Sequence, residues 1–280
     1  MKVFIIGTGT MGMGIAQVFS QSGNDVIIFD IKGELIENGL AKLNKSLEKI
    51  IAKGKMSIKD KEEILARISV AESYKDASEC DLVIEAISEN IQAKKDLFKI
   101  LDSICNNSAI LASNTSSLSI TEISCNLKAA DRIIGMHFFN PAPVMKLVEL
   151  VKGVSTSDIT LKRAKEIVNM TGKEYVEVNE SPGFIVNRIL IPMINEAVCV
   201  LSENVASKED IDKAMVLGAN HPIGPLALAD LIGLDVCVSI LNVLYEETKE
   251  IKYKADPLLK KLVSLGNLGR KTGQGFYKYD

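Results

Sequence analysis

The sequence of 280 residues lacks several features that mark common classes of protein. Its five cysteines form no CxxC pair and do not cluster with either of the two histidines, so no disulfide framework or zinc site is indicated. The net charge of −3 favours neither nucleic acid nor an acidic membrane as a partner. No uninterrupted apolar stretch is long enough to span a bilayer, and glycines end the apolar run of MKVFIIGTGT too early for a signal peptide. We therefore expect a cytoplasmic protein with reduced thiols.

What the chain does contain is an alternation of short apolar segments with helical patterns. Strands are expected at residues 2–7, 25–30, 81–87, 109–114, 132–139, 145–151 and 173–179. Helical patterns lie between many of them, for example at residues 91–104 and 160–170. This alternation predicts an α/β fold of the Rossmann type, with a doubly wound, mainly parallel sheet and helices on both of its faces.

Two parts of the chain depart from the alternation. Residues 34–71 show no convincing strand, and their leucines and isoleucines at helical spacing predict a helical hairpin that turns near residues 54–56. Lysines line the outer face of this hairpin, at Lys42, Lys45, Lys49, Lys53 and Lys55. After Ser181-Pro182-Gly183 strand patterns disappear, so we expect a first domain of residues 1–183 and a smaller all-α domain of residues 184–280.

The motif GTGTMG supplies three glycines where the first strand gives way to the first helix. In that position Gly7 allows a tight turn, Gly9 lets the backbone approach a pyrophosphate, and Gly12 lets the helix pack closely on the strand. The helix amino terminus also stabilises negative charge. An ordinary strand-to-helix turn is the less favoured alternative, because Asp30 follows at the end of the next strand, as in dinucleotide-binding proteins.

Asp30 bears on which nicotinamide cofactor is bound. A carboxylate accepts hydrogen bonds from the ribose hydroxyls of NAD but repels the 2′-phosphate of NADP. Lys32 lies nearby and would soften that repulsion, so the sequence favours NAD without excluding NADP.

The stretch HFFNPAPVMKLVEL begins with His137 at the carboxyl end of a predicted strand and carries Glu149 within the next strand. A carboxylate inside a buried strand is costly unless it is paired, and His137 is the obvious partner. Such a pair fixes the tautomer of the imidazole and stabilises the imidazolium, as a general base requires. An isolated histidine of this kind is more often a core residue, but a dinucleotide site on the same sheet favours the proton carrier.

Two further stretches carry polar residues whose purpose the pattern leaves open. In ASNTSSLSI, at residues 112–120, serine and asparagine either form a turn or donate hydrogen bonds to a substrate oxygen. In SPGFIVNRI, Asn187 and Arg188 interrupt an apolar helix just past the domain boundary. They either cap that helix or face the substrate.

Taken together, GTGTMGMGIA, ASNTSSL, HFFNPAPVMKLVE, SPGFIVNRI and GRKTGQGFY make the whole chain resemble the L-3-hydroxyacyl-CoA dehydrogenase family. In length it is similar to the bacterial 3-hydroxybutyryl-CoA dehydrogenases within that family. The resemblance implies an NAD-dependent oxidoreductase that interconverts 3-hydroxybutyryl-CoA and acetoacetyl-CoA. It further implies an NAD-binding first domain and a second domain for substrate binding and dimerisation.

The resemblance also implies roles for individual residues. His137 is the implied general base, oriented by Glu149. Ser116, in preference to Ser117, contacts the substrate oxygen near the nicotinamide, and Asn187 positions the thioester. The implied NAD contacts are Gly7, Gly9, Thr10, Met11, Gly12, Asp30, Glu89, Lys94, Ser116, Asn140 and Lys271. The implied coenzyme A contacts are Ser46 and Lys53 on the lysine-rich hairpin, where a solvated surface remains the alternative for most of the lysines.

Two other functions share part of this pattern. A dehydrogenase of a free hydroxy acid such as L-gulonate shares much of the architecture, but the basic hairpin favours a CoA thioester. A non-catalytic protein that binds NAD is the second alternative, and the joint presence of Ser116, His137, Glu149 and Asn187 argues against it.

The helix FIVNRILIPMINEAVCVL bears on assembly. Apolar residues occur on nearly all of its sides, which indicates burial on more than one face. We therefore expect a homodimer or a dimer of dimers, joined mainly through residues 184–280.

Overall fold

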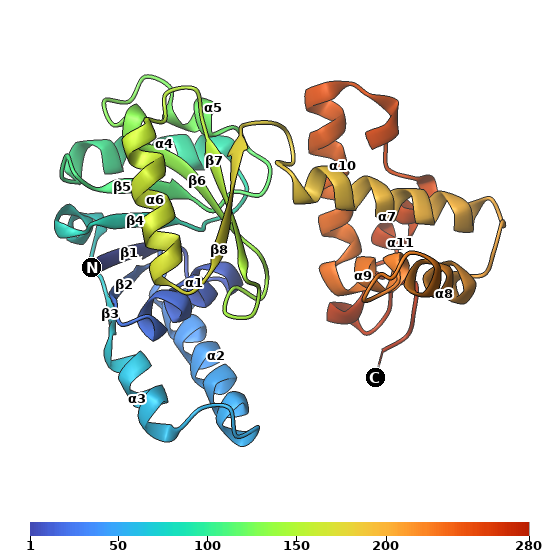
Figure 1. The fold of residues 1–280 in the computed structure, drawn as a ribbon, viewed down its shortest axis with the longest axis horizontal. Coiled ribbons are helices and arrows are strands. Elements are labelled where there is room, and N and C mark those ends of the chain that lie inside the picture. The colour runs from blue at the N-terminus through green and yellow to red at the C-terminus, as the bar shows by residue number, and fades with distance from the viewer. Residues whose placement is uncertain (280) are drawn as a thin grey trace. The chain divides into compact units, whose positions relative to one another are not determined.

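The computed structural model describes residues 1–279 and divides into two compact units, Met1–Ser181 and Pro182–Asp280 (Figure 1). The division lies close to the boundary expected at Gly183. The first unit contains all of the named strands, and the second is built from α-helices and short 3-10 turns. Each unit has a hydrophobic core of its own.

The first unit is built on one sheet with the strand order β3-β2-β1-β4-β5-β6-β7-β8. In chain order the strands are β1 (Lys2–Ile6), β2 (Asp25–Phe29), β3 (Ile68–Val70), β4 (Leu82–Glu85), β5 (Ile110–Ser113), β6 (Ile133–Phe138), β7 (Leu147–Lys152) and β8 (Glu174–Asn179). Neighbouring strands are parallel except β6 and β7, which are antiparallel. The order runs outward from β1 in both directions, so the predicted doubly wound, Rossmann-type sheet is confirmed. Ligands of such sheets bind beyond the carboxyl ends of the strands where the order reverses, here between β1 and β4.

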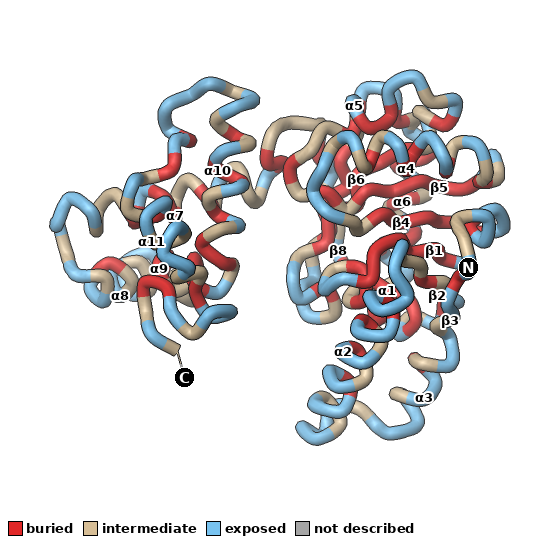
Figure 2. The backbone as a smooth tube through the Cα atoms, turned by 180° about the vertical axis from the view of Figure 1, so that it is seen from behind, coloured by how far each residue is buried: buried red, intermediate tan, exposed pale blue. Residues whose placement is uncertain are grey.

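Helices cover both faces of this sheet. Side chains such as Ile84 and Met136 form one core with helices α1 (Thr10–Gln21) and α6 (Asp158–Met170). Side chains alternate along a strand, so the residues next to these point to the opposite face. Helices α4 (Ile91–Ile104) and α5 (Ile120–Ser124) lie over that opposite face. Short 3-10 turns η1 (Tyr74–Glu79) and η2 (Ala130–Arg132) complete the connections. Figure 2 shows the central strands, among them β4, β5 and β6, as the most buried part of the unit.

Polar side chains gather on the face that α4 and α5 cover, at the carboxyl ends of β4, β5 and β6 and at the adjoining position of the antiparallel strand β7. In register, Glu85 of β4 lies beside Ser113 of β5, and Ser113 lies beside Gly135 of β6. His137, two residues beyond Gly135 and on the same face, lies beside Glu149 of β7. The sheet therefore carries a row of polar residues where a substrate of this fold class is expected.

The predicted helical hairpin is confirmed as α2 (Gly33–Ala52) and α3 (Ile58–Ala66), which extend away from the sheet (Figure 1). The expectation that residues 34–71 contain no strand is wrong, because β3 pairs with β2 at the edge of the sheet. Only three residues form this strand, and Ser69 and Val70 are exposed, so it leaves no hydrophobic pattern in the sequence. Backbone pairing to β2 holds it instead.

The second unit is a helical domain. Its helices are α7 (Val186–Ser202), α8 (Lys208–Gly218), α9 (Pro225–Ile232), α10 (Leu234–Thr248) and α11 (Pro257–Ser264), with 3-10 turns η3 (Ile251–Tyr253) and η4 (Arg270–Thr272). Ser207 caps α8 by accepting a hydrogen bond from the backbone of Asp210, as the sequence predicts. The core of the second unit includes Leu226, Leu241 and Leu244, none of which is exposed.

Helices α9 and α10 form the most apolar part of the second unit. Within the described residues no single helix is long and apolar enough to cross a membrane. The pair α9 and α10 meets the requirement of length and composition only when taken together, across a bend of 95°. Asp230 in α9 is buried and accepts hydrogen bonds from the backbone of Phe276 and Tyr277, so the closing segment of the chain satisfies its charge.

Candidate active site

The glycine-rich turn between β1 and α1 brings backbone segments close together and leaves space in front of Gly9. Gly7 adopts a φ of +99°, and a Cβ on Gly7 would lie 2.5 Å from the carbonyl oxygen of Ala86. A Cβ on Gly12 would lie 1.8 Å from the carbonyl oxygen of Gly7, so α1 can pack this closely only with glycine there. A Cβ on Gly9 would meet nothing within 4 Å among the described residues. The space before Gly9, at the amino terminus of α1, suits a pyrophosphate.

Asp30 is tied directly to this turn. Its Oδ2 accepts hydrogen bonds from the backbone N–H and the hydroxyl of Thr8, at 2.8 and 3.0 Å. Its Oδ1 accepts from the backbone N–H of Ile31 at 2.8 Å. The carboxylate is thus fixed beside the turn that would hold the pyrophosphate, in a position suited to ribose hydroxyls. Thr10 and Met11 follow on the first turn of α1, where Thr10 is exposed.

His137 and Glu149 form a buried pair across β6 and β7. The Nδ1 atom of His137 lies 2.7 Å from the Oε2 atom of Glu149. Glu149 is fully buried and His137 is 6% exposed. A carboxylate so placed holds the proton on Nδ1, which makes Nε2 the nitrogen able to accept a proton. The aromatic ring of Phe139 lies 4.5 Å from the imidazole, centroid to centroid, and restricts its rotation.

The turn after β5 carries Ser116 and is held by Glu89. The Oε1 atom of Glu89 accepts hydrogen bonds from the hydroxyls of Thr115 and Ser117, at 2.6 and 3.2 Å. It also accepts from the backbone N–H and the hydroxyl of Ser116, at 3.0 and 3.3 Å. Burial opposes the ionised form of Glu89, but the Lys94 ammonium and the Thr115 and Ser116 hydrogen bonds hold its pKa below the ordinary value. The turn is therefore organised around an anionic carboxylate.

Lys94 is an interior residue in this structure. Its side chain is 1% exposed, and its ammonium lies 2.5 Å from the Oε1 atom of Glu85 and 3.3 Å from the Oε2 atom of Glu89. The resemblance implies that Lys94 contacts NAD. The structure shows that its charge is directed to two carboxylates of the protein.

Three residues of this network carry no role in the sequence analysis. Thr8 fixes Asp30, as described above, and Glu85 pairs with Lys94. Asn114 accepts a hydrogen bond at 2.9 Å from the backbone N–H of Phe138, the residue after His137. An acidic residue inside the apolar run LVIEAI, at residues 82–87, was the available signal for Glu85.

The remaining candidate residues lie on other elements of the first unit or in the second unit. Asn140 is exposed on the loop that follows β6. Ser46 and Lys53 are exposed on α2 and at its carboxyl end. In the second unit, Asn187 lies on the first turn of α7, and the Lys271 ammonium pairs with Asp235 at 2.6 Å. The structure thus brings together His137 with Glu149, and Glu89 and Lys94 with the turn of Ser116.

Comparison with known protein families accounts for nearly the whole chain. Residues 2–181 match the model described as "3-hydroxyacyl-CoA dehydrogenase, NAD binding domain", and residues 183–279 match "3-hydroxyacyl-CoA dehydrogenase, C-terminal domain". The chain belongs to the 3-hydroxyacyl-CoA dehydrogenase family. Its first unit is the NAD-binding domain of that family, and the open turn at Gly9 fits the cofactor.

Individual members of the 3-hydroxyacyl-CoA dehydrogenase family are similar over their full length. A 3-hydroxybutyryl-CoA dehydrogenase of Clostridioides difficile is 54% identical over 100% of both chains. The mitochondrial hydroxyacyl-coenzyme A dehydrogenase of Sus scrofa is 42% identical over 99% of this chain and 90% of its own. The crystal structure of (S)-3-hydroxybutyryl-CoA dehydrogenase PaaH1 from Ralstonia eutropha is 49% identical, with a TM-score of 0.94 over 100% of this chain and 99% of that chain.

Proposed function

We propose that this 3-hydroxyacyl-CoA dehydrogenase interconverts 3-hydroxybutyryl-CoA and acetoacetyl-CoA with NAD. The single observation that supports it most is the buried His137–Glu149 pair at the carboxyl end of the sheet that carries the dinucleotide-binding turn. The 3-hydroxybutyryl-CoA dehydrogenase of Clostridioides difficile, 54% identical, supports the short acyl chain.

The reaction requires a proton and a hydride to leave the same alcohol. NAD, when bound, supplies the hydride chemistry at its nicotinamide ring. In the oxidative direction Nε2 of His137 takes the proton of the 3-hydroxyl group, and Glu149 stabilises the imidazolium that forms. In the reductive direction the imidazolium returns that proton to the developing alkoxide. Ser116 donates a hydrogen bond to the reacting oxygen, and Asn187 positions the thioester.

An assay of NADH oxidation with acetoacetyl-CoA tests this function. We expect turnover with short acyl-CoA substrates and little with free hydroxy acids such as L-gulonate. Activity confined to free hydroxy acids would replace the proposed substrate class. Binding of NADH without any turnover would make the protein a non-catalytic NAD-binding protein.

Asp30 is expected to determine the preference for NADH over NADPH. Asp30→Ser is expected to raise the kcat/KM for NADPH relative to NADH by about tenfold, since unit charges about 4 Å apart interact by about 1–4 kcal/mol. Steady-state kinetics with both cofactors measure the ratio. Asp25→Ser, at the other end of β2, is the matched control and should leave the ratio unchanged. A wild-type protein that prefers NADPH would show that Lys32 outweighs the carboxylate.

The hairpin supports coenzyme A as the carrier of the acyl group. Lys45, Lys49 and Lys53 are spaced four residues apart at exposed positions of α2 and its carboxyl end, and Ser46 lies beside them. None of these three lysines forms an ion pair with another described residue. A row of unpaired ammonium groups suits the phosphates of the nucleotide, which carry the opposite charge.

Lys53→Glu is expected to raise the KM for acetoacetyl-CoA by about three- to tenfold, because it removes one exposed attractive charge and introduces a repulsive one. The effect should be smaller with a truncated thioester that lacks the nucleotide. It should also be smaller at about 1 M salt, where charges are screened over about 3 Å instead of the 8–10 Å of physiological ionic strength. Lys59→Glu on α3 makes the same change of charge and serves as the control. Equal losses with both thioesters would mean that the hairpin does not bind coenzyme A.

The second unit supports self-association as part of the proposal. Ile189, Leu217 and Leu231 are each more than half exposed. Exposed apolar side chains of this size favour a protein partner, and a second copy of the chain is the simplest one. We expect light scattering to give two or four times the chain mass of 30.5 kDa. A monomer mass with activity intact would contradict assembly through residues 184–280.

A cytoplasmic location completes the proposal. The five cysteines are free thiols, which suits a reducing compartment. Burial raises the pKa of Cys80 and of Cys105 to about 11, so these two thiols stay protonated and unreactive at neutral pH.

A further inference from the structure

Glu85 is a fully buried carboxylate at the end of β4. Its Oε1 atom accepts hydrogen bonds from the backbone N–H of Ile87 at 2.8 Å and from the Lys94 ammonium at 2.5 Å. Its Oε2 atom accepts from the hydroxyl of Ser113 at 2.7 Å. A buried carboxylate with three donors on three different segments fixes those segments relative to one another.

Two routes lead from Glu85 to the turn of Ser116. In the first, Glu85 holds the ammonium of Lys94, which also lies 3.3 Å from Glu89, the carboxylate that accepts from both the N–H and the hydroxyl of Ser116. In the second, Glu85 holds the hydroxyl of Ser113, which accepts a hydrogen bond at 3.2 Å from the backbone of Thr115. Both routes end within one residue of Ser116.

We propose that Glu85 is a positioning residue of this active site, which sets the place of Ser116 through Lys94 and Glu89 and through Ser113. The inference rests on the proposed role of Ser116 at the substrate oxygen. Glu85 acts through other residues, because its side chain is fully buried beneath them.

The need for stability alone does not account for this arrangement. Replacing a buried ion pair by apolar residues of similar size is often neutral or stabilising, so such pairs are weak evidence of a stabilising role. Here one ammonium lies between two carboxylates, and this excess of negative charge is compensated by hydroxyl and backbone donors from the turn of Ser116. Order in that turn is therefore coupled to the charge state of the network.

The test uses Glu85→Gln, which removes the charge and keeps the size of the side chain. We expect kcat with acetoacetyl-CoA to fall by about 10- to 100-fold, the loss that a misplacement of about 1 Å produces, with a much smaller change in the KM of the substrate. The Kd of NADH, measured by the fluorescence of the bound cofactor, should change little.

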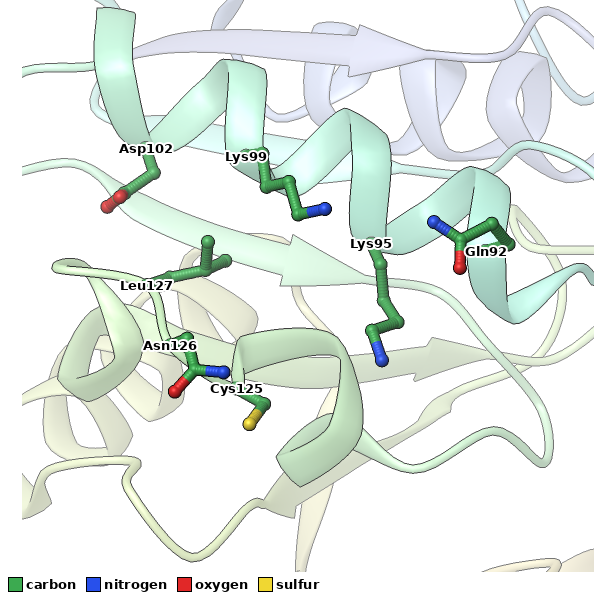
Figure 3. A pocket seen from close by; sticks show the side chains of 7 residues that line it. All are labelled: Gln92, Lys95, Lys99, Asp102, Cys125, Asn126 and Leu127. Carbon is green, nitrogen blue, oxygen red and sulfur yellow. The ribbon is translucent and has the colours of Figure 1, made fainter.

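Two further variants keep the test decisive. Ser113→Ala removes one hydroxyl and breaks only the second route, so it remains folded and should lose activity in the same way but to a smaller extent. Lys95→Met is the matched control on α4. Its ammonium lies 3.3 Å from Glu122 and points into the surface pocket that is lined by α4 and by residues 125–127 (Figure 3). The Lys95→Met variant should keep wild-type kinetics.

A double-mutant cycle with Ser116→Ala distinguishes an effect of Glu85 on the position of Ser116 from a general loss of stability. If Glu85 acts through Ser116, Glu85→Gln and Ser113→Ala lower kcat by less than about twofold in the Ser116→Ala background. The inference would be overturned if Glu85→Gln or Ser113→Ala lowered kcat as much in the Ser116→Ala background as in the wild-type protein. A wild-type kcat in a folded Glu85→Gln or Ser113→Ala protein would overturn it as well. Its failure is distinct from failure of the proposed function, in which the wild-type protein itself does not reduce acetoacetyl-CoA.

Discussion

Replacing His137 by asparagine is expected to lower kcat for the reduction of acetoacetyl-CoA by about 10²–10⁴, the contribution of a positioned general acid or base. Asparagine is close to histidine in size and can still donate to Glu149, so the buried carboxylate keeps a partner. It cannot carry a proton to or from the substrate oxygen. The loss should therefore appear in kcat, while the KM of the thioester and the Kd of NADH change little.

The other histidine of the chain provides the control for this substitution. His221 lies between α8 and α9 in the second unit, and His221→Asn should leave kcat unchanged. Circular dichroism and NADH fluorescence would show that both variants fold and bind the cofactor. A His137→Asn protein that turns over at the wild-type rate would make His137 a core residue and would require another proton carrier.

Glu149→Gln is expected to have the second largest effect, a fall in kcat of about 100-fold, the lower end of what a positioned general acid or base contributes. A glutamine presents either its oxygen or its NH2 group to Nδ1. When the NH2 group faces Nδ1, the proton moves to Nε2, and Nε2 can no longer accept a proton from the substrate. A neutral amide also stabilises the imidazolium less than a carboxylate at 2.7 Å does.

The KM of acetoacetyl-CoA should rise far less than kcat falls, because orientation and charge stabilisation matter chiefly in the transition state. Glu177→Gln on the neighbouring strand β8 is the matched control, since Glu177 is exposed and pairs with Lys165 on the surface. Near-normal turnover in a folded Glu149→Gln protein would refute the role proposed for Glu149.

Much of the fold could be predicted because its signals are local. The buried strands are short runs of β-branched and leucine residues, and the hairpin has a helical period over two long segments. The strand β3 could not be predicted, because three residues at a sheet edge depend on backbone pairing with β2 alone. Ser69 and Val70 in this strand are exposed and give no apolar pattern.

The candidate site shows the same contrast between local and distant signals. His137 and Glu149 were predictable as a pair, because a carboxylate within a buried strand demands a partner and only one histidine lies near it in the sequence. The importance of Thr8 and Asn114 lies in contacts with residues 22 and 24 positions away, which no local pattern records. The sequence likewise gives no sign that the ammonium of Lys94 faces two carboxylates of the protein.

The antiparallel pairing of β6 and β7 has a consequence for how this enzyme can change. Because His137 and Glu149 face each other across a backbone ladder, their separation does not depend on the loop of residues 139–146 that joins the strands. That loop exposes Val144 and Met145, so these two side chains can change while the proton-transfer pair stays in place. A deletion of one residue inside β7 would instead turn Glu149 into the apolar core and a valine or leucine toward the imidazole. Substitution of Val144 and Met145 therefore leaves the chemistry intact, whereas the strand beside the loop tolerates no change of length.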